Sequence, residues 1–211
     1  MNDYATSGLA QFPVARNPQA VSLWFNAKAT VAKQVLICLR KEGESGYELG
    51  LMDGLVQAWS YADRPLFEGT DGRAVEPDRW YHVAMVTDRE KRPVLFLDGA
   101  PVGTGPVEPN GNRTPTSSFI GTGDGWGDLY AGKLDEVRVW NVIRSPEQLR
   151  DEFDGLPTDG ELGLVAYYSF DESSGVRVYD HSGVGNHASL GDGIPEYTPL
   201  RVLSDSPVAR R

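Results

Sequence analysis

The sequence predicts an all-β protein, a two-sheet antiparallel β-sandwich with one short helix, from three observations. The 24 glycines and 14 prolines of the 211 residues are spread between many short apolar runs. Short runs bounded by turn residues are typical of all-β sandwiches. Apolar residues alternate within several of these runs with a period of two, and helical spacing stands out in one segment.

The expected strands follow from these apolar runs. In chain order they cover Val21–Phe25, Gln34–Arg40, Gly46–Leu51, Leu55–Tyr61, Trp80–Asp88, Pro93–Asp98, Ala100–Thr104, Phe119–Gly121, Gly132–Trp140 and Leu164–Phe170, with a further strand at Tyr197–Val202. The Asp53-Gly54 and Asp98-Gly99 pairs predict tight turns between neighbouring strands, because glycine tolerates a positive φ.

Two of these strands carry more detailed signals. Both faces of Trp80–Thr87 are mostly apolar, as in a central strand of a sandwich. In Gly132–Trp140 the alternation is interrupted at Asp135 and Glu136, which predicts a β-bulge there.

The helix begins after Ser145, which can cap it together with Gln148, while Pro146 suits the first helical position. Gly155 and Pro157 end it. We expect a single domain over residues 1–211, with its core at about 21–203. Pro157–Gly163 has the composition of a linker, although the strand after it could belong to the same sheet.

Composition excludes several classes of partner. The chain has 20 Lys and Arg against 30 Asp and Glu, a formal net charge of −10, which repels nucleic acids and anionic membranes but attracts cations such as Ca²⁺. No apolar run approaches the ~18 residues of a membrane span, so no membrane insertion is expected. The N-terminus shows no pattern of a signal peptide.

The single cysteine, Cys38, lies in an apolar run and is expected to be a buried structural thiol.

The sequence assigns no catalytic residues, and we expect the chain not to be an enzyme. A glycosidase needs two carboxylates that can act together across the scissile bond. Asp135 and Glu136 are neighbours, and a regular strand directs neighbours to opposite faces. His82, on an expected strand, is interpreted as a packed and hydrogen-bonded histidine rather than a general base.

Two stretches, WYHVAMVTD…VLFLDGAPVGT and LYAGKLDEVRVWNVIRSPEQLRDEF, resemble the laminin-G-like, concanavalin A-like superfamily, which includes pentraxin-like lectins. LVAYYSFDESSGVRVYDHSGVGNHASL is similar to another hallmark of that group, and we interpret it as a closing strand of the same domain. The resemblance implies a jelly roll, two curved antiparallel sheets packed face to face. The fold alone does not determine the function, because this group includes binding modules, adhesion domains and glycan-cleaving enzymes. The resemblance also implies that Trp24, Trp80 and Trp140 lie in the core.

The resemblance further implies a structural Ca²⁺ held by Asp180, Asn186 and Asp135. Calcium prefers oxygen ligands, and the loop from Asp180 to His187 offers two side-chain oxygens and flexible glycines. The alternative is that Asp180 and Asn186 form only side-chain-to-backbone turns.

Glycan recognition would use aromatic rings outside the core with polar neighbours. The candidate ligand-binding residues are Trp126, Asp128 and Tyr130 around a glycine-rich loop, and Tyr61 and Arg64 after another strand. Trp59, which shares a face with Tyr61, is expected to fill the core.

The predicted function is a non-catalytic, lectin-like carbohydrate-binding module with a glycan as its partner. The alternatives are an adhesion or assembly module that binds a surface protein, and a divergent glycan-cleaving enzyme. The resemblance implies an extracellular or cell-surface location, and the chain could form part of a larger multidomain protein.

Overall fold

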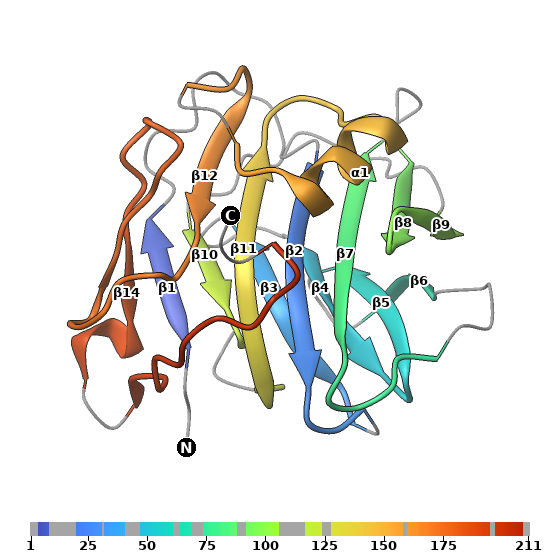
Figure 1. The fold of residues 1–211 in the computed structure, drawn as a ribbon. Helices are drawn as coiled ribbons and strands as arrows, with labels where there is room; N and C mark the ends of the chain where they lie inside the picture. Colours follow the sequence, from blue (N-terminus) through green and yellow to red (C-terminus); the bar gives the residue numbers. More distant parts are fainter. Residues whose placement is uncertain are drawn as a thin grey trace.

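The computed structural model describes the chain except for residues 1–3, 9–19, 31, 41–46, 61–63, 69–73, 88–91, 106–116, 124–127, 158–159, 195–196 and 209–211. The predicted all-β sandwich is confirmed: two antiparallel sheets face each other, and one α-helix lies outside them (Figure 1). The eight-stranded sheet contains, in spatial order, β13 (Arg177–Val178), β14 (Ala188–Leu190), β1 (Ala5–Gly8), β10 (Ser117–Ile120), β3 (Gln34–Arg40), β4 (Tyr47–Met52), β5 (Leu55–Ser60) and β6 (Arg64–Glu68). The six-stranded sheet contains β12 (Leu164–Tyr168), β11 (Gly132–Trp140), β2 (Ala20–Ala27), β7 (Trp80–Thr87), β8 (Pro93–Leu97) and β9 (Ala100–Thr104).

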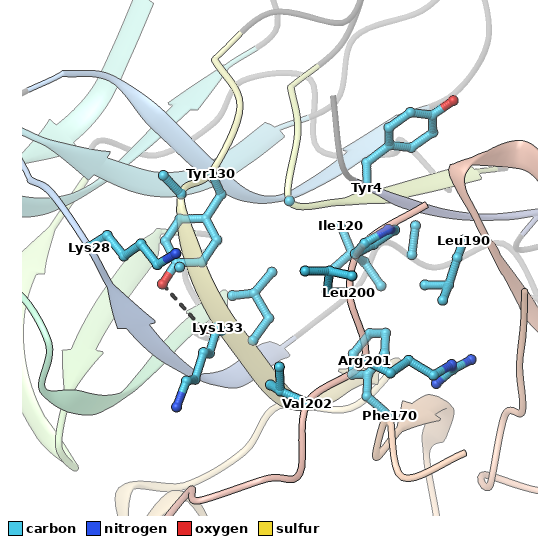
Figure 2. A pocket seen from close by; sticks show the side chains of 16 residues that line it. Tyr4, Lys28, Ile120, Tyr130, Lys133, Phe170, Leu190, Leu200, Arg201 and Val202 are labelled. Carbon is cyan, nitrogen blue, oxygen red and sulfur yellow. Dashed lines mark hydrogen bonds between the residues drawn. The ribbon is translucent and has the colours of Figure 1, made fainter. Parts of the chain in front are cut away.

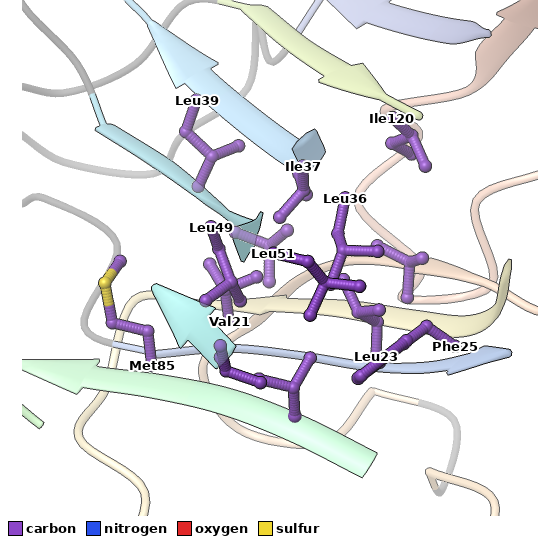
Figure 3. Close-up of a cluster of buried hydrophobic side chains, with 14 of the residues drawn as sticks. Val21, Leu23, Phe25, Leu36, Ile37, Leu39, Leu49, Leu51, Met85 and Ile120 are labelled. Carbon is purple, nitrogen blue, oxygen red and sulfur yellow. The ribbon is translucent and has the colours of Figure 1, made fainter. Parts of the chain in front are cut away.

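The main hydrophobic core lies between the two sheets (Figure 3). The period-two pattern explains which side chains fill it. On β2, for example, Val21, Leu23 and Phe25 point into the core. The side chains between them, Ser22 and Trp24, face the opposite side of the sheet, where they meet the helix.

Helix α1 (Pro146–Asp154) covers part of this outer side, and the C-terminal segment crosses another part of it (Figure 1). The predicted capping box is present: Ser145 accepts from the Gln148 backbone N–H, and the Gln148 side chain accepts from the Ser145 N–H. Leu149 packs into a second buried cluster with Trp140 and Tyr167 of the sheet. Trp24 and Trp140 are buried as expected, on this outer side. Trp80 is only half-buried, because it lies near the sheet end and donates to Asp205.

Local signals in the sequence located turns and the bulge correctly. Both residues of the turns Asp53-Gly54 and Asp98-Gly99 have positive φ, as a primed turn requires. The predicted bulge lies at Glu136, where φ is 55° and the register between β11 and β2 shifts. β12 pairs with β11, so the strand after the linker-like stretch belongs to the same sheet.

One predicted strand is wrong and others were missed. Residues 197–202 form no strand, although Tyr197 still accepts from the Tyr4 backbone N–H. Strands β1, β6, β13 and β14 were not predicted; each is short, and none carries the apolar alternation that marks the other strands. No described helix is long and apolar enough to cross a membrane.

Candidate functional site

A cavity of about 440 Å³ opens at one end of the sandwich, where β1 and β10 face β11 (Figure 2). This volume falls in the usual range for ligand pockets, ~300–1,000 Å³. Most of its described lining is apolar, from Ala5, Ile120, Leu134, Phe170, Leu190, Pro199, Leu200 and Val202. The polar lining includes the phenols of Tyr4 and Tyr130 and the side chains of Lys28, Lys133 and Arg201.

The segment that leads into β11 is fixed at the cavity by backbone hydrogen bonds. The Tyr130 N–H donates to Gly121 O at 2.9 Å, and the Lys28 N–H donates to Ala131 O at 2.9 Å. The Ala131 N–H donates to the side-chain oxygen of Gln34 at 3.0 Å. Tyr130 is therefore held between the ends of β10, β2 and β3.

Tyr130 presents a half-buried ring to the cavity. Its hydroxyl donates to the carbonyl oxygen of Lys133 at 3.2 Å, and its burial raises the pKa of the phenol, so it stays protonated. Gly132 makes room for it. A Cβ at position 132 would lie 2.4 Å from the Tyr130 hydroxyl and 2.2 Å from Asn26 O, which only glycine avoids.

The C-terminal segment forms one wall of the cavity and is attached to the sheet by its polar residues. Asp205 accepts from Lys133 Nζ at 2.8 and 2.9 Å and from Trp80 Nε1 at 3.2 Å. Asp135 accepts hydrogen bonds from Ser204 and, at 2.7 Å, from Ser206. These contacts hold Leu200 and Val202 at the cavity.

Of the predicted ligand-binding residues, only Tyr130 is placed in the cavity by the structure. Asp128 is exposed and forms an ion pair with Lys33 at 2.8 Å on the outer side of the eight-stranded sheet. Trp126 and Tyr61 lie outside the described residues, and Arg64 begins β6. The predicted grouping of these five residues therefore stays a prediction.

Trp59 is buried, with 3% of its surface exposed, but it belongs to neither hydrophobic cluster. Its neighbour Ala58 points into the core, so Trp59 faces the outer side of the eight-stranded sheet. Lys33 Nζ lies 4.9 Å from its ring centroid, and a Cβ at Gly50 would come within 3.0 Å of the ring. Trp59 is thus buried as expected, on the outer side of the eight-stranded sheet, because its strand parity directs it outward.

The loop that begins at Asp180 is held by hydrogen bonds within the chain. One carboxylate oxygen of Asp180 accepts from the N–H groups of Tyr167 and Ser182, both at 2.9 Å. The other accepts from Ser182 Oγ, Gly185 N–H and Asn186 N–H at 2.8, 3.0 and 2.8 Å. A carboxylate has about four lone-pair sites, so these five donors leave none directed at a cation.

The other two predicted calcium ligands are also engaged by the chain. The Asn186 side-chain amide donates to Val165 O at 2.9 Å, and Asp135 binds the serines of the C-terminal segment. Among the described residues, no group of three or more His, Cys, Asp or Glu is arranged to hold a metal ion. As arranged here, Asp180, Asn186 and Asp135 do not fit one calcium site, and calcium binding stays a prediction.

The adjacent carboxylates of Asp135 and Glu136 lie on the same side of the sheet, which corrects the expectation of opposite faces. Asp135 binds the C-terminal segment, and Glu136 accepts from Arg138 at 2.6 Å and from the Tyr167 hydroxyl at 2.9 Å, beneath α1. The positive φ of Glu136 reverses the normal alternation at the bulge. Burial raises the pKa of Asp135 and raises that of Glu136 to about 7.

Two further residues behave largely as predicted. Cys38 is a buried free thiol, and its burial raises its pKa to about 12. His82 is fully buried and packs against Trp24 and Phe153, but its ring nitrogens form no hydrogen bond, so the expected hydrogen bond is wrong. Its Nε2 lies 3.6 Å from the Glu152 carboxylate, and burial lowers its pKa.

Sequence reasoning missed Lys28, Lys133, Phe170 and the cavity-lining residues of the C-terminal segment. The segment was expected to add a strand, and instead its serine, aspartate and arginine side chains attach it to the surface of the sandwich. No pattern in the sequence marks Lys28, because its place depends on how the end of β2 meets residue 131.

Comparison with known families agrees with this architecture. The model of the concanavalin A-like lectin/glucanases superfamily matches residues 2–150, more than half of the chain. The chain belongs to this superfamily. No curated protein sequence matches it.

Several solved structures share the fold. A candidate carbohydrate-binding protein from Bacteroides ovatus has a TM-score of 0.64 at 22% identity, covering 90% of this chain and 56% of its own. Domain 4 of an extracellular arabinanase from Geobacillus stearothermophilus, in complex with arabinotriose, has a TM-score of 0.55 at 22% identity, covering 66% of this chain and 68% of its own. A heptameric pentraxin from Limulus polyphemus has a TM-score of 0.55 at 16% identity, covering 94% and 98%. Our chain therefore spans little more than half of the length of the Bacteroides protein. At identities of 16–22%, the likeness to these three structures concerns the fold.

Proposed function

We propose that the protein is a non-catalytic carbohydrate-binding module that holds a sugar in the cavity beside Tyr130. One observation carries this proposal: an open cavity of about 440 Å³ is lined by the aromatic residues Tyr130 and Phe170 and by the exposed Lys28. Aromatic rings pack against the C–H faces of sugars, and a few polar groups fix the orientation of the hydroxyls. The Bacteroides and Geobacillus structures, whose names refer to carbohydrate binding and to arabinotriose, support this class of ligand.

The absence of catalysis rests on where the carboxylates lie. None of the described residues that line the cavity is an aspartate or glutamate, whereas glycosidases place two carboxyl groups across the scissile bond. The buried pair of Asp135 and Glu136 is only 4% and 3% exposed, and both carboxylates are hydrogen-bonded within the protein. A sugar could not reach them without moving α1 or the C-terminal segment.

A location outside the cell and a place in a larger protein remain part of the proposal, and a surface-protein partner without a sugar ligand is its alternative. The arabinanase whose domain shares this fold is described as extracellular.

The test is a Tyr130→Leu variant measured against a panel of oligosaccharides. Leucine keeps apolar volume at the core but removes the flat ring, so we expect affinity for the best ligand to fall at least tenfold. Tyr179→Leu is the matched control, because Tyr179 is an exposed tyrosine outside the cavity lining. Isothermal titration calorimetry would give both affinities. Equal affinities in the wild type and in Tyr130→Leu would show that the sugar binds elsewhere.

A further inference from the structure

The charged residues of the cavity have the opposite sign to the protein. The chain as a whole carries a formal charge of −10, yet the charged side chains of the described lining, Lys28, Lys133 and Arg201, are all cationic. A cationic side chain at a binding site favours ligands of the complementary charge when no internal carboxylate pairs with it.

Two of the three cations already have partners. Lys133 Nζ contacts both carboxylate oxygens of Asp205, at 2.8 and 2.9 Å. The Arg201 guanidinium donates to the Glu172 carboxylate at 2.9 Å and to the carbonyl oxygens of Gly175 and Arg177 at 3.2 and 2.9 Å. Neither charge is therefore available to a ligand unless these contacts break.

Lys28 differs from both. Its backbone is fixed by the hydrogen bond to Ala131 O, but its ammonium group has no ion pair or hydrogen bond with any residue that the structure describes. Its side chain is exposed and lies on the same side of the cavity as Tyr130 (Figure 2). A cation without a partner among the described residues thus lies beside the ring that would contact a sugar.

We propose that the ligand of this cavity is an acidic oligosaccharide, whose carboxylate or sulfate pairs with the Lys28 ammonium while its ring packs on Tyr130. This inference rests on the proposed carbohydrate-binding function and adds the charge of the ligand. A hydroxyl could also accept from Lys28, but hydrogen bonds in which both groups are charged are stronger. No carboxylate of the described lining competes for that ammonium.

The contact between Lys133 and Asp205 shows that a lysine of the cavity lining already pairs with a carboxylate that lies outside the lining. The Asp205 side chain reaches its lysine from the exposed C-terminal segment, with both oxygens engaged. A ligand carboxylate at Lys28, unlike one at Lys133, would displace no carboxylate of the residues that the structure describes.

The experiment compares neutral, carboxylated and sulfated oligosaccharides on one array, and then by calorimetry at low salt. We expect the anionic members to bind about fivefold more tightly than the neutral ones, and this advantage to shrink when 0.5 M NaCl is added, because an exposed ion pair is screened. In Lys28→Met, which keeps most of the side-chain stem, we expect affinity for the anionic ligand to fall about fivefold, the upper range for one exposed pair.

Two variants and the pattern of binding separate the outcomes. Arg150→Met removes one exposed positive charge on α1, away from the cavity lining, and should leave affinity unchanged. Lys28→Arg should restore most of it. Equal binding of neutral and anionic sugars, or an anionic ligand indifferent to Lys28→Met, would overturn the inference while carbohydrate binding stands. Binding to no member of the array would overturn both.

Discussion

The layer beneath helix α1 and the cavity at the end of the sandwich both contain charged groups, but they use them differently. Beneath α1, the Glu152 carboxylate is 5% exposed and accepts from Ser22 and from Arg144 Nε at 3.3 Å. Arg138 donates to Glu136 and to the carbonyl oxygens of Glu152 and Gly155. In the cavity, by contrast, Lys28 has an ammonium group with no described partner.

This difference separates groups that maintain the fold from groups that can bind. Charges removed from water are tolerated when they are paired and hydrogen-bonded, and then any ligand must compete with those contacts. An exposed charge beside an open cavity carries no such cost. The contrast predicts that changes beneath α1 alter stability, whereas changes at the cavity alter affinity.

The largest expected effect comes from Glu152→Ala. It leaves Arg138 and Arg144 buried without the carboxylate that they approach at 3.6 and 3.3 Å, so we expect the free energy of unfolding to fall by about 3–5 kcal/mol. Urea denaturation measures this change. Glu147→Ala, on the exposed side of the same helix, serves as the control and should have no measurable effect.

Measuring the ligand affinity of a Glu152 variant provides a second test of the same comparison. Glu152→Gln keeps one side-chain oxygen, which can still accept from either Ser22 or Arg144. If the comparison is correct, this variant is less destabilised than Glu152→Ala and binds its ligand with unchanged affinity. A loss of affinity in a folded Glu152→Gln would mean that the layer beneath α1 and the cavity are coupled.

A smaller effect is expected on the pH dependence of stability. Burial raises the pKa of Glu136 from 4.5 to about 7, so between these values the folded state binds more protons than the unfolded state. The contribution of Glu136 to stability is therefore full below about pH 4.5 and is lost as the pH rises through 7. In Glu136→Gln this loss disappears, and unfolding temperatures measured from pH 5 to 8 should fall less steeply than in the wild type.

The matched control is Glu76→Gln, because Glu76 is an exposed glutamate. His82 contributes a slope of the opposite sign, since burial lowers its pKa and stability falls as the pH drops below its ordinary value of 6.5. Both variants keep His82, so the difference between their curves isolates Glu136. Parallel curves would show that Glu136 is already ionised in the folded protein.

Local chemistry made most of the fold predictable, but not the cavity. The Asp-Gly turns, the Ser145 cap and the bulge at Glu136 each depend on a few neighbouring residues, whose backbone preferences the sequence displays directly. The cavity wall depends instead on long-range contacts: Ser204 and Ser206 bind Asp135, which lies 69 and 71 positions earlier in the sequence. Such contacts leave no periodic pattern.

The position of single side chains was also hard to predict. Trp59 was expected in the core because of its residue type, and strand parity placed it on the outer side of the eight-stranded sheet. Tyr130 was proposed because an aromatic ring stands out beside a glycine-rich loop, and the structure places it in the cavity lining. Lys28 has no comparable signal, since an exposed lysine after a strand is common and only the folded structure shows what lies beside it.

The smallest expected effect is that of metal removal at Asp180, which the comparison assigns to the groups that maintain the fold. Both of its carboxylate oxygens accept hydrogen bonds from the chain, as those of Glu152 do. We therefore expect EDTA to leave the unfolding temperature unchanged, whereas Asp180→Ala should lower it strongly, because several buried N–H groups lose their acceptor. A ligand that binds only the folded state stabilises it by mass action, so a fall in unfolding temperature on chelation, reversed by added Ca²⁺, would instead establish a calcium site in this protein.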